Sequence, residues 1–182
     1  MSKKKLMIFV VVICMLLSVG ILGWSANRKA PDFKLKTIDG ESVQLSDHLN
    51  KGPILIDFWA TWCVPCLKEM DEFQKLYAKY HERGFEIFGI TIDNPRTASK
   101  IKPTVKSKGF TFPILLDPNK EVYKQLGGKS VVPYMMIVNP DGEILMTYEG
   151  YKAGNEKVIE QQILPFLKDI PTDSTVSESK SE

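Results

Sequence analysis

The sequence predicts a single α/β domain with a central mixed β-sheet and helices on its faces. Two apolar runs of strand length, residues 54–59 and 85–92, flank an amphipathic segment of helical period. Strand, helix and strand in this order form a right-handed parallel unit. Two pairs of extended segments, each around an Asp-Gly turn, add antiparallel hairpins before and after that unit. At 182 residues with 43% hydrophobic content, the chain can bury one ordinary core.

The first 26 residues are expected to target or anchor the chain. Lysines at positions 3–5 precede residues 6–24, which carry no charged side chain. At about 1.5 Å per residue, a helix of this length nearly spans a hydrocarbon core of roughly 30 Å. A signal peptide is normally shorter, so we favour an uncleaved anchor, although Gly23-Trp24-Ser25 would serve as a cleavage site. The lysines keep that end in the cytoplasm and place the rest outside.

The remaining boundaries follow from composition. Residues 27–170 are expected to form the folded domain, which opens at Pro31 after a short polar linker. Residues 171–182 are too polar to pack and are expected to be disordered. Cys14 follows Ile13, where lipid attachment would require a small residue, so we interpret Cys14 as an apolar side chain of the membrane segment.

The folded domain begins with a predicted hairpin. Residues 33–36 and 42–45 flank Asp39-Gly40, a dipeptide that favours a tight turn between two strands. Ser46 and Asp47 are then expected to cap a short helical turn, which the following glycine and proline end.

The strand, helix and strand unit comes next. Residues 54–59 are apolar except for Asp57, which suits a strand covered on both faces of a sheet. Apolar residues then recur at steps of three and four from Leu67 to Tyr80, and Gly84 ends this helix. Residues 85–92 return as the second buried strand.

Short elements connect this unit to the end of the domain. A helix is expected at residues 95–108, where Pro103 must kink or divide it. A short extended segment at residues 112–116 follows, and then a helix at residues 119–126 that ends at two glycines.

A hairpin and a helix close the domain. Residues 134–138 and 143–149 flank Asn139-Pro140-Asp141-Gly142, a strong hairpin signal. The last helix is expected at residues 155–167. Its inner side should carry Val158, Ile159, Ile163, Phe166 and Leu167.

The motif that carries chemistry is Cys63-Val64-Pro65-Cys66, between a buried strand and the start of a helix. A helix N-terminus presents free N–H groups and partial positive charge, which stabilise a thiolate on the first cysteine. Pro65 suits the first helical turn because no N–H is needed there. The expected chemistry is attack by the Cys63 thiolate on a partner disulfide, followed by resolution of the mixed disulfide by Cys66.

Other interpretations of two cysteines at this spacing fit less well. A closed zinc site needs four ligands, and outside the apolar segment the chain offers no further cysteine and only His48 and His81. Covalent haem attachment requires histidine where Leu67 stands, so it is excluded. A purely structural disulfide between residues three apart would be strained.

Asp57 is the second informative residue, because it is a carboxyl within an apolar strand. Loss of hydration should oppose its ionisation, which suits it to exchange a proton with the second thiol through water. The alternative is an aspartate that reaches solvent at a strand end.

Val132-Pro133 precedes a predicted strand, far in sequence from the cysteines. A cis X–Pro bond in a tight turn would leave the Val132 backbone groups free to pair with a substrate strand. By itself, however, a proline at the start of a strand is usually trans and merely structural.

The segment DFWATWCVPC, residues 57–66, resembles the thioredoxin superfamily, and specifically its membrane-anchored TlpA/ResA-like branch. The resemblance extends over about residues 31–167. It implies a thioredoxin-like fold: a central mixed β-sheet flanked by helices, an N-terminal β-hairpin, and an inserted segment after the βαβ unit, here about residues 94–126.

The resemblance also implies roles for single residues. Asp57 matches the buried proton-transfer aspartate, and Pro133 matches the cis-proline that faces the cysteine pair. Glu69 matches a glutamate that tunes thiol ionisation near the active site. Without the resemblance, Glu69 would be interpreted as an exposed helix charge.

The expected substrate-binding surface surrounds the cysteines. Its residues are Trp62, Val64, Pro65, Val132 and Pro133. The chain departs from the family pattern here, because Tyr134-Met135 stands where many relatives carry threonines and Val64 replaces a glycine or glutamate. Both departures lie near the predicted substrate groove, where they bear on partner choice and redox potential.

The sequence therefore predicts a thiol-disulfide oxidoreductase of the bacterial cell membrane, single-pass, with its C-terminal domain extracytoplasmic, or secreted to the periplasm if the signal is cleaved. The resemblance implies that it reduces disulfides in exported proteins, with apocytochromes in cytochrome c maturation as one substrate class. A membrane thiol donor, such as a transmembrane electron-transfer protein, would recharge it.

Competing functions remain open at this point. The motif does not fix the direction of exchange, so a disulfide-forming oxidant is an alternative. A peroxidase would share the opening of the domain but would not need two cysteines. A copper-binding assembly factor would use two thiolates and a histidine, and a redox-inert adaptor would use neither cysteine chemically.

Composition narrows the remaining classes. The net charge is +2 and no basic face is concentrated in the sequence, so no nucleic-acid partner is expected. We find no signature of a nucleotide, flavin or metal, and no cofactor is expected.

Overall fold

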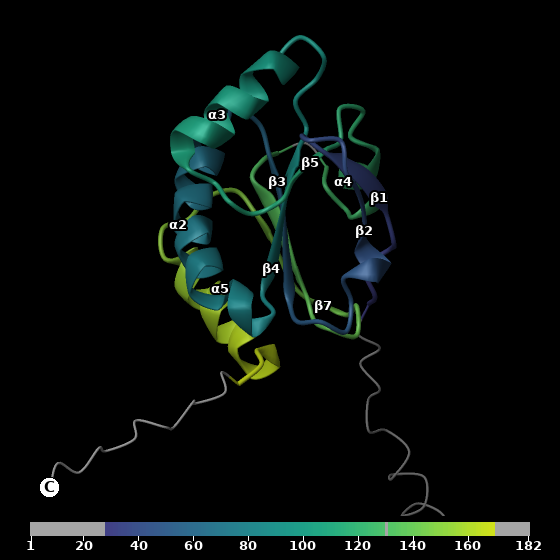
Figure 1. The fold of residues 1–182 in the computed structure, drawn as a ribbon, viewed down its shortest axis with the longest axis vertical. Coiled ribbons are helices and arrows are strands. Elements are labelled where there is room, and N and C mark those ends of the chain that lie inside the picture. The colour runs from purple at the N-terminus through teal and green to yellow at the C-terminus, as the bar shows by residue number, and fades with distance from the viewer. Residues whose placement is uncertain (1–27, 130, 170–182) are drawn as a thin grey trace, which may run out of the picture.

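The computed structural model describes residues 28–129 and 131–169, which form one seven-stranded mixed sheet with helices packed against it (Figure 1). The strand order is β2-β1-β5-β4-β3-β6-β7. The expected anchor at residues 1–26, the start of the domain at residue 27, its end at residue 170 and the tail at residues 171–182 lie outside the described residues. Within the described part, no helix has the length and apolarity needed to cross a membrane.

The N-terminal hairpin extends one edge of the sheet. Strands β1 (Lys34–Thr37) and β2 (Ser42–Gln44) pair antiparallel, as predicted, and β1 also pairs antiparallel with β5 (Ile114–Leu116). The segment expected as an insertion therefore supplies the strand between the hairpin and the rest of the sheet.

A short 3-10 turn, η1 (Leu45–Asp47), follows the hairpin, but the predicted caps are wrong. The turn begins one residue before Ser46, and no side chain caps it. The carboxylate of Asp32 accepts the backbone N–H of Ser46 instead, at 2.9 Å. The sequence pattern missed this because Asp32 is fourteen residues away.

The centre of the sheet is β3 (Ile54–Trp59), whose six residues are all buried. It pairs parallel with β4 (Glu86–Thr91) and antiparallel with β6 (Tyr134–Val138), which continues to β7 (Ile144–Glu149). An uninterrupted apolar strand suits this position because both faces of the sheet are covered there.

Helices cover opposite faces of β3. Helix α2 (Val64–Tyr80) lies on the face of Asp57, and Tyr123 of α4 (Glu121–Gln125) packs against Phe58 on the other, with ring centroids 5.2 Å apart. Successive residues of a strand point to opposite faces of the sheet, so Asp57 and Phe58 lie on the two faces that the helices cover. Helix α5 (Asn155–Ile163) lies beside α2, as Figure 1 shows.

The helix bounds deviate from prediction where prolines and 3-10 turns occur. Helix α3 (Ile101–Lys108) follows the 3-10 turn η3 (Ala98–Lys100), and Pro103 neither kinks nor divides it. Pro103 stands in the first turn, where its missing N–H is not required. Helix α5 passes into the 3-10 turn η4 (Leu164–Phe166) before Pro165.

The inner face of α5 carries Ile159 and Ile163, both fully buried, but Val158 is 41% exposed and its predicted inward position is wrong.

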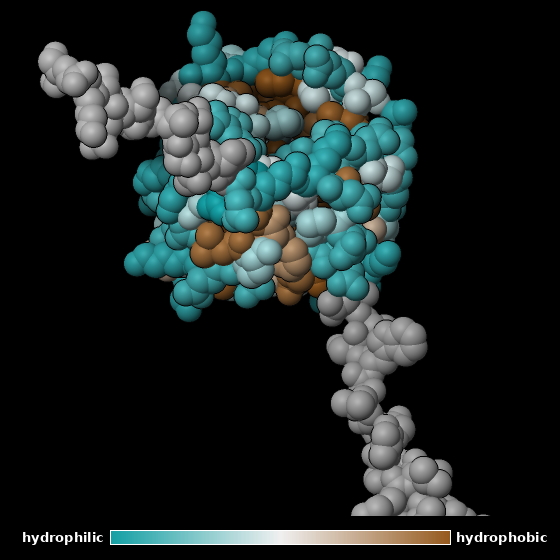
Figure 2. All heavy atoms as spheres, turned by 60° about the horizontal axis from the view of Figure 1, so that its bottom comes forward, coloured by the Kyte–Doolittle hydropathy of each residue, from teal (hydrophilic) through white to brown (hydrophobic). Residues whose placement is uncertain are grey.

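Figure 2 brings forward the lower end of the view in Figure 1. Hydrophilic side chains dominate that face, and apolar side chains gather only in limited patches.

Candidate active site

The cysteine pair stands where β3 passes into α2. Cys63 is the N-cap residue of α2, its Sγ accepts the backbone N–H of Cys66 at 3.3 Å, and Pro65 lies in the first turn, as expected. Cys63 and Cys66 form a disulfide with an S–S distance of 2.02 Å. The N–H that points at Cys63 Sγ is a donor that would also stabilise a thiolate there.

The two sulfurs differ in their surroundings. Cys66, in the first turn of α2, is fully buried. Cys63 is 4% exposed, and the side chains on either side of it reach solvent. Trp62 is 57% exposed and Val64 is 64% exposed. The exposed surface next to the pair is therefore apolar on the side of Cys63.

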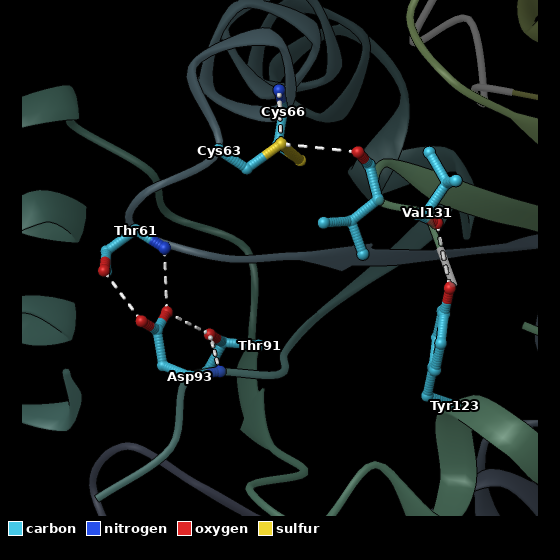
Figure 3. Close-up of a disulfide and its surroundings, with 8 residues drawn as sticks. Thr61, Cys63, Cys66, Thr91, Asp93, Tyr123 and Val131 are labelled. Atoms are coloured by element: carbon cyan, nitrogen blue, oxygen red, sulfur yellow. Dashed lines mark hydrogen bonds between the residues drawn. A yellow bond between two sulfur atoms is a disulfide. The ribbon is translucent and has the colours of Figure 1, made fainter. Parts of the chain in front are cut away.

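A second segment completes the site from the other side. The Val132–Pro133 peptide bond is cis, and Cys63 Sγ lies 3.6 Å from the carbonyl oxygen of Val132. The hydroxyl of Tyr123 donates to the carbonyl of Val131 at 2.9 Å and holds this segment, as Figure 3 shows. The sequence-predicted residues on both segments thus meet at the reactive sulfur.

Asp57 is buried in the middle of β3, with 1% of its surface exposed. Neither carboxyl oxygen has a hydrogen-bond partner. Burial, reinforced by the nearby Glu69 carboxyl, raises the pKa of Asp57 well above its usual value. The alternative, an aspartate that reaches solvent at a strand end, is therefore wrong for Asp57.

Glu69 is also buried, with 2% exposed, because it lies one helical turn after Cys66 on the inner face of α2. Burial raises the pKa of Glu69 to about 7, and the neighbouring Asn155 acts in the opposite direction. Neither the Glu69 carboxyl oxygens nor Asn155 Nδ2 makes a hydrogen bond in the structure. The expectation of an exposed helix charge does not hold, and Asn155 was not found from the sequence.

A third buried carboxyl, Asp93, contacts the loop that leads to Cys63, and it was not predicted from the sequence. It accepts hydrogen bonds from the backbone N–H of Thr61 at 2.8 Å, the hydroxyl of Thr61 at 2.7 Å and the hydroxyl of Thr91 at 2.7 Å. Figure 3 shows this network beneath the cysteine loop. The sequence could have indicated this contact, because β3 and β4 are parallel neighbours and the residues that follow their carboxyl ends lie close together.

The pKa of Asp93 is shifted in the opposite direction to the pKa values of Asp57 and Glu69. Burial acts to raise its pKa, but hydrogen bonds from Thr97, Thr61 and Thr91 outweigh burial and place the pKa below the usual value. The charged carboxylate therefore ties the loop before Cys63 to the end of β4.

Both histidines of the chain lie at the other end of the domain. His48 Nδ1 contacts Glu86 Oε2 at 2.5 Å, beside the residue that opens β3, and the cysteines follow the far end of that strand. His81 follows α2, and its Nδ1 lies 3.0 Å from the carbonyl of Tyr77. Fifteen helical residues, about 22 Å, separate it from Cys66. In the described ranges, no group of three or more His, Cys, Asp or Glu side chains is arranged to hold a metal ion.

Comparison with known proteins agrees with this geometry. Residues 26–147 match the model of the AhpC/TSA family. The thiol-disulfide oxidoreductase ResA of Bacillus cereus is 30% identical over 92% of this chain and 98% of its own length. ResA of Oceanobacillus iheyensis is 41% identical over 66% of this chain and 63% of its own length.

A solved structure shows the same fold. The thioredoxin-like protein of Porphyromonas gingivalis superposes with a TM-score of 0.63 at 31% sequence identity, over 76% of this chain and 93% of that one. The sheet order and the disulfide at the start of α2 define a thiol-disulfide oxidoreductase of thioredoxin-like fold. The chain belongs to the AhpC/TSA family and, within the thioredoxin superfamily, to the TlpA/ResA-like thiol-disulfide oxidoreductases.

Proposed function

We propose that this oxidoreductase works outside the cytoplasm, tethered to the bacterial cell membrane, and reduces disulfides in exported proteins. The observation that carries the proposal is the position of Cys63: its sulfur lies beside Val132 O and between exposed apolar side chains, where a protein segment can dock. The proposed substrates include apocytochromes during cytochrome c maturation, a class that comes from the family resemblance.

The reaction is a two-electron thiol-disulfide exchange. The Cys63 thiolate attacks one sulfur of the partner disulfide, forms a mixed disulfide, and releases the other partner sulfur as a thiolate that takes up a proton. The Cys66 thiolate then attacks Cys63 Sγ, which forms the Cys63–Cys66 disulfide and releases the second partner thiol. A membrane-bound dithiol donor restores the two thiols by the same exchange in reverse.

The buried carboxyls supply the proton transfer in this proposal. Asp57 takes the proton of the Cys66 thiol before the second attack, and its raised pKa brings it closer to that of a thiol, which favours transfer. Glu69, one turn from Cys66, influences Asp57 through its own charge, so the two carboxyls ionise in turn.

Substrate binding uses the two segments that meet at Cys63. The Val132 backbone groups before the cis-proline pair with an extended partner segment. Trp62, Val64 and Pro65 provide the apolar contact beside the partner cysteine, in line with the exposure of Trp62 and Val64.

The membrane location rests on the N-terminal sequence. Lysines at positions 3–5 followed by the uncharged run at residues 6–24 support a single-pass anchor with the N-terminus in the cytoplasm. A cysteine pair on the outer side would be recharged by a donor within the membrane.

The equilibrium reduction potential of the Cys63–Cys66 couple tests the function. The full-length chain carrying Cys14→Ala, in non-ionic detergent, would be equilibrated in dithiothreitol buffers, and free thiols would be counted by mass tagging. Thioredoxin and DsbA differ by about 150 mV, roughly 7 kcal/mol, so the reducing and oxidising assignments are well separated. We expect a value near that of thioredoxin.

The other outcomes are equally informative. A value near that of DsbA would assign the protein to disulfide formation, and the absence of a reversible two-thiol couple would refute the oxidoreductase. Turnover of hydrogen peroxide at a rate above that of disulfide exchange would favour the peroxidase. Labelling of reduced Cys63 in intact cells by a membrane-impermeant maleimide tests the location, with Cys63→Ser as the control.

A further inference from the structure

A groove of 530 Å³ opens beside the reactive cysteine. Its apolar lining includes Trp62 and Val132, the residues that stand on the two sides of Cys63. Among the described residues that line it, the charged ones are all lysines: Lys120, Lys124 and Lys129. The groove therefore combines an apolar floor with a rim of one charge sign.

The positive charge of this rim is not neutralised by an ion pair within the described part of the chain, although Lys129 also lines a second groove with Glu149. All three lysines are exposed, and none takes part in an ion pair there, whereas Lys79, Lys102 and Lys108 elsewhere are paired. The carboxylate of Asp117, at the base of α4, accepts backbone N–H groups of that helix. Glu121 Oε1 accepts from Asn119 at 3.3 Å. A low-dielectric groove with unpaired cations attracts anionic groups.

The rim is fixed relative to the reactive sulfur. Lys120 precedes α4 and Lys124 lies on it, and Tyr123 between them donates its hydroxyl to Val131 O at 2.9 Å (Figure 3). The next residue, Val132, places its carbonyl oxygen 3.6 Å from Cys63 Sγ. A segment that presents a disulfide to Cys63 through this groove must therefore pass the lysines.

We propose that the groove selects redox partners whose disulfide is flanked by acidic residues. The inference deepens the proposed function and rests on it: aspartate or glutamate near the partner cysteine would contact the lysines while an apolar neighbour fills the floor. A redox partner is favoured over an anionic lipid surface because Val132, which lines the groove, has its carbonyl oxygen 3.6 Å from Cys63 Sγ. Charge complementarity of this kind acts mainly on the association rate.

Three disulfide-linked peptides test the proposal. They share one core sequence and differ only in whether acidic, neutral or basic residues flank the cysteine. The reduced full-length chain with Cys14→Ala, in non-ionic detergent, reacts with each peptide, and the second-order rate constant is measured at low and high salt. We expect the acidic peptide to react about 10-fold faster than the neutral one at low salt, with the ratio falling toward one as salt screens the charges.

Two matched triple variants test whether the groove lysines cause the faster reaction of the acidic peptide. The groove variant carries Lys120→Gln, Lys124→Gln and Lys129→Gln, and its acidic-to-neutral ratio should fall to about one. The control variant has the same net charge and carries exposed changes on other faces: Lys100→Gln, Lys106→Gln and Lys157→Gln. It should keep the ratio of the parent chain.

Each other outcome overturns a defined statement. Equal rates for acidic and neutral peptides, or equal loss of the ratio in both triple variants, would refute the acidic-partner groove. If the groove variant kept the ratio but lost binding to vesicles of anionic phospholipid, the lysines would serve a membrane surface instead. Failure of all three peptides to react would refute the proposed function rather than this inference.

Discussion

The buried carboxyls around the active-site loop fall into two kinds, whose pKa values are shifted in opposite directions. Asp57 and Glu69 face the buried Cys66 side without hydrogen bonds, and their pKa values lie above the usual range. Asp93, buried to the same degree, accepts three hydrogen bonds from Thr61 and Thr91, and its pKa lies below that range.

The difference shows that hydrogen-bond donors, rather than burial, decide the protonation of these groups. A carboxyl surrounded by donors stays charged and serves as a tether for the loop before Cys63. A carboxyl deprived of donors keeps its proton to a higher pH, which for Glu69 is about 7. The charged Asp93 thus holds the loop before Cys63, whereas the raised pKa values of Asp57 and Glu69 suit these residues to the proton exchange proposed above.

The largest expected effect concerns the proton held by Glu69. The unfolded side chain ionises near 4.5 and the folded one near 7, so the folded state binds more protons between these values. Stability therefore falls as pH rises through this interval, by about 3 kcal/mol for a shift from 4.5 to about 7. Glu69→Gln should remove this part of the slope, measured by denaturant unfolding of the oxidised full-length chain from pH 4.5 to 8.

The control for Glu69 is Glu82→Gln, which changes an exposed glutamate after the same helix and should preserve the pH profile of the parent chain. An unchanged slope in Glu69→Gln would mean that Glu69 is not the group that takes up the proton. In that case the contrast with Asp93 would rest on Asp57 alone.

Asp57→Asn tests whether the donor-free site transfers protons during the reaction. With an aromatic disulfide that releases a coloured thiol, the first release reports attack by Cys63 and the second reports attack by Cys66. We expect the second phase to slow about 100-fold, or about 2.7 kcal/mol, because the base for the Cys66 thiol is lost. Asp71→Asn, which removes an ion pair between α2 and Lys108 of α3, should leave both phases unchanged. Equal slowing of both phases would contradict the assignment.

Replacement of aspartate by asparagine should lower the stability of the fold at Asp93 and raise it at Asp57. Asp93→Asn replaces an acceptor of buried donors and should cost about 2 kcal/mol of the free energy of unfolding at pH 7. Asp57→Asn removes a carboxyl that the fold disfavours in its charged form, and should raise stability at that pH. Urea unfolding of the two variants makes the comparison, and a loss of stability in both would show that the sites do not differ as inferred.

The sheet was well predicted from the sequence because its central strands are uninterrupted apolar runs. The predicted bounds of β3 and β6 agree with the structure to the residue, and the two hairpins followed from their Asp-Gly turns. The ends of α3 and α5 were less well predicted, because 3-10 turns extend a helical pattern without continuing the helix.

The site was predictable only where a motif or a broken pattern marked it. Cys63, Cys66 and Asp57 stand out locally, and a carboxyl that interrupts an apolar strand predicts its own burial. Asp93 ends a strand as many aspartates do, and only the pairing of β3 with β4 brings it to Thr61. Lys120, Lys124 and Asn155 meet the site through tertiary contacts that no local pattern contains.

The smallest expected effect tests a single donor of the Asp93 tether. Thr91→Val keeps the shape of a fully buried side chain but removes the hydroxyl that donates to the Asp93 carboxylate at 2.7 Å and accepts the Asp93 backbone N–H at 3.2 Å. A hydrogen bond to a charged group contributes about 1.5 kcal/mol, so stability should fall by that amount and the pKa of Asp93 should rise. Thr111→Val removes a hydroxyl that accepts from exposed Gln74, and should cost about 0.5 kcal/mol or less. Because the pKa of Asp93 lies below its usual value, its stabilisation is present at neutral pH and is lost as pH falls through the folded pKa. Thr91→Val should therefore narrow its stability difference from the parent chain in acid. A difference independent of pH would show that the hydroxyl acts through packing or the Asp93 backbone N–H rather than by holding the charge.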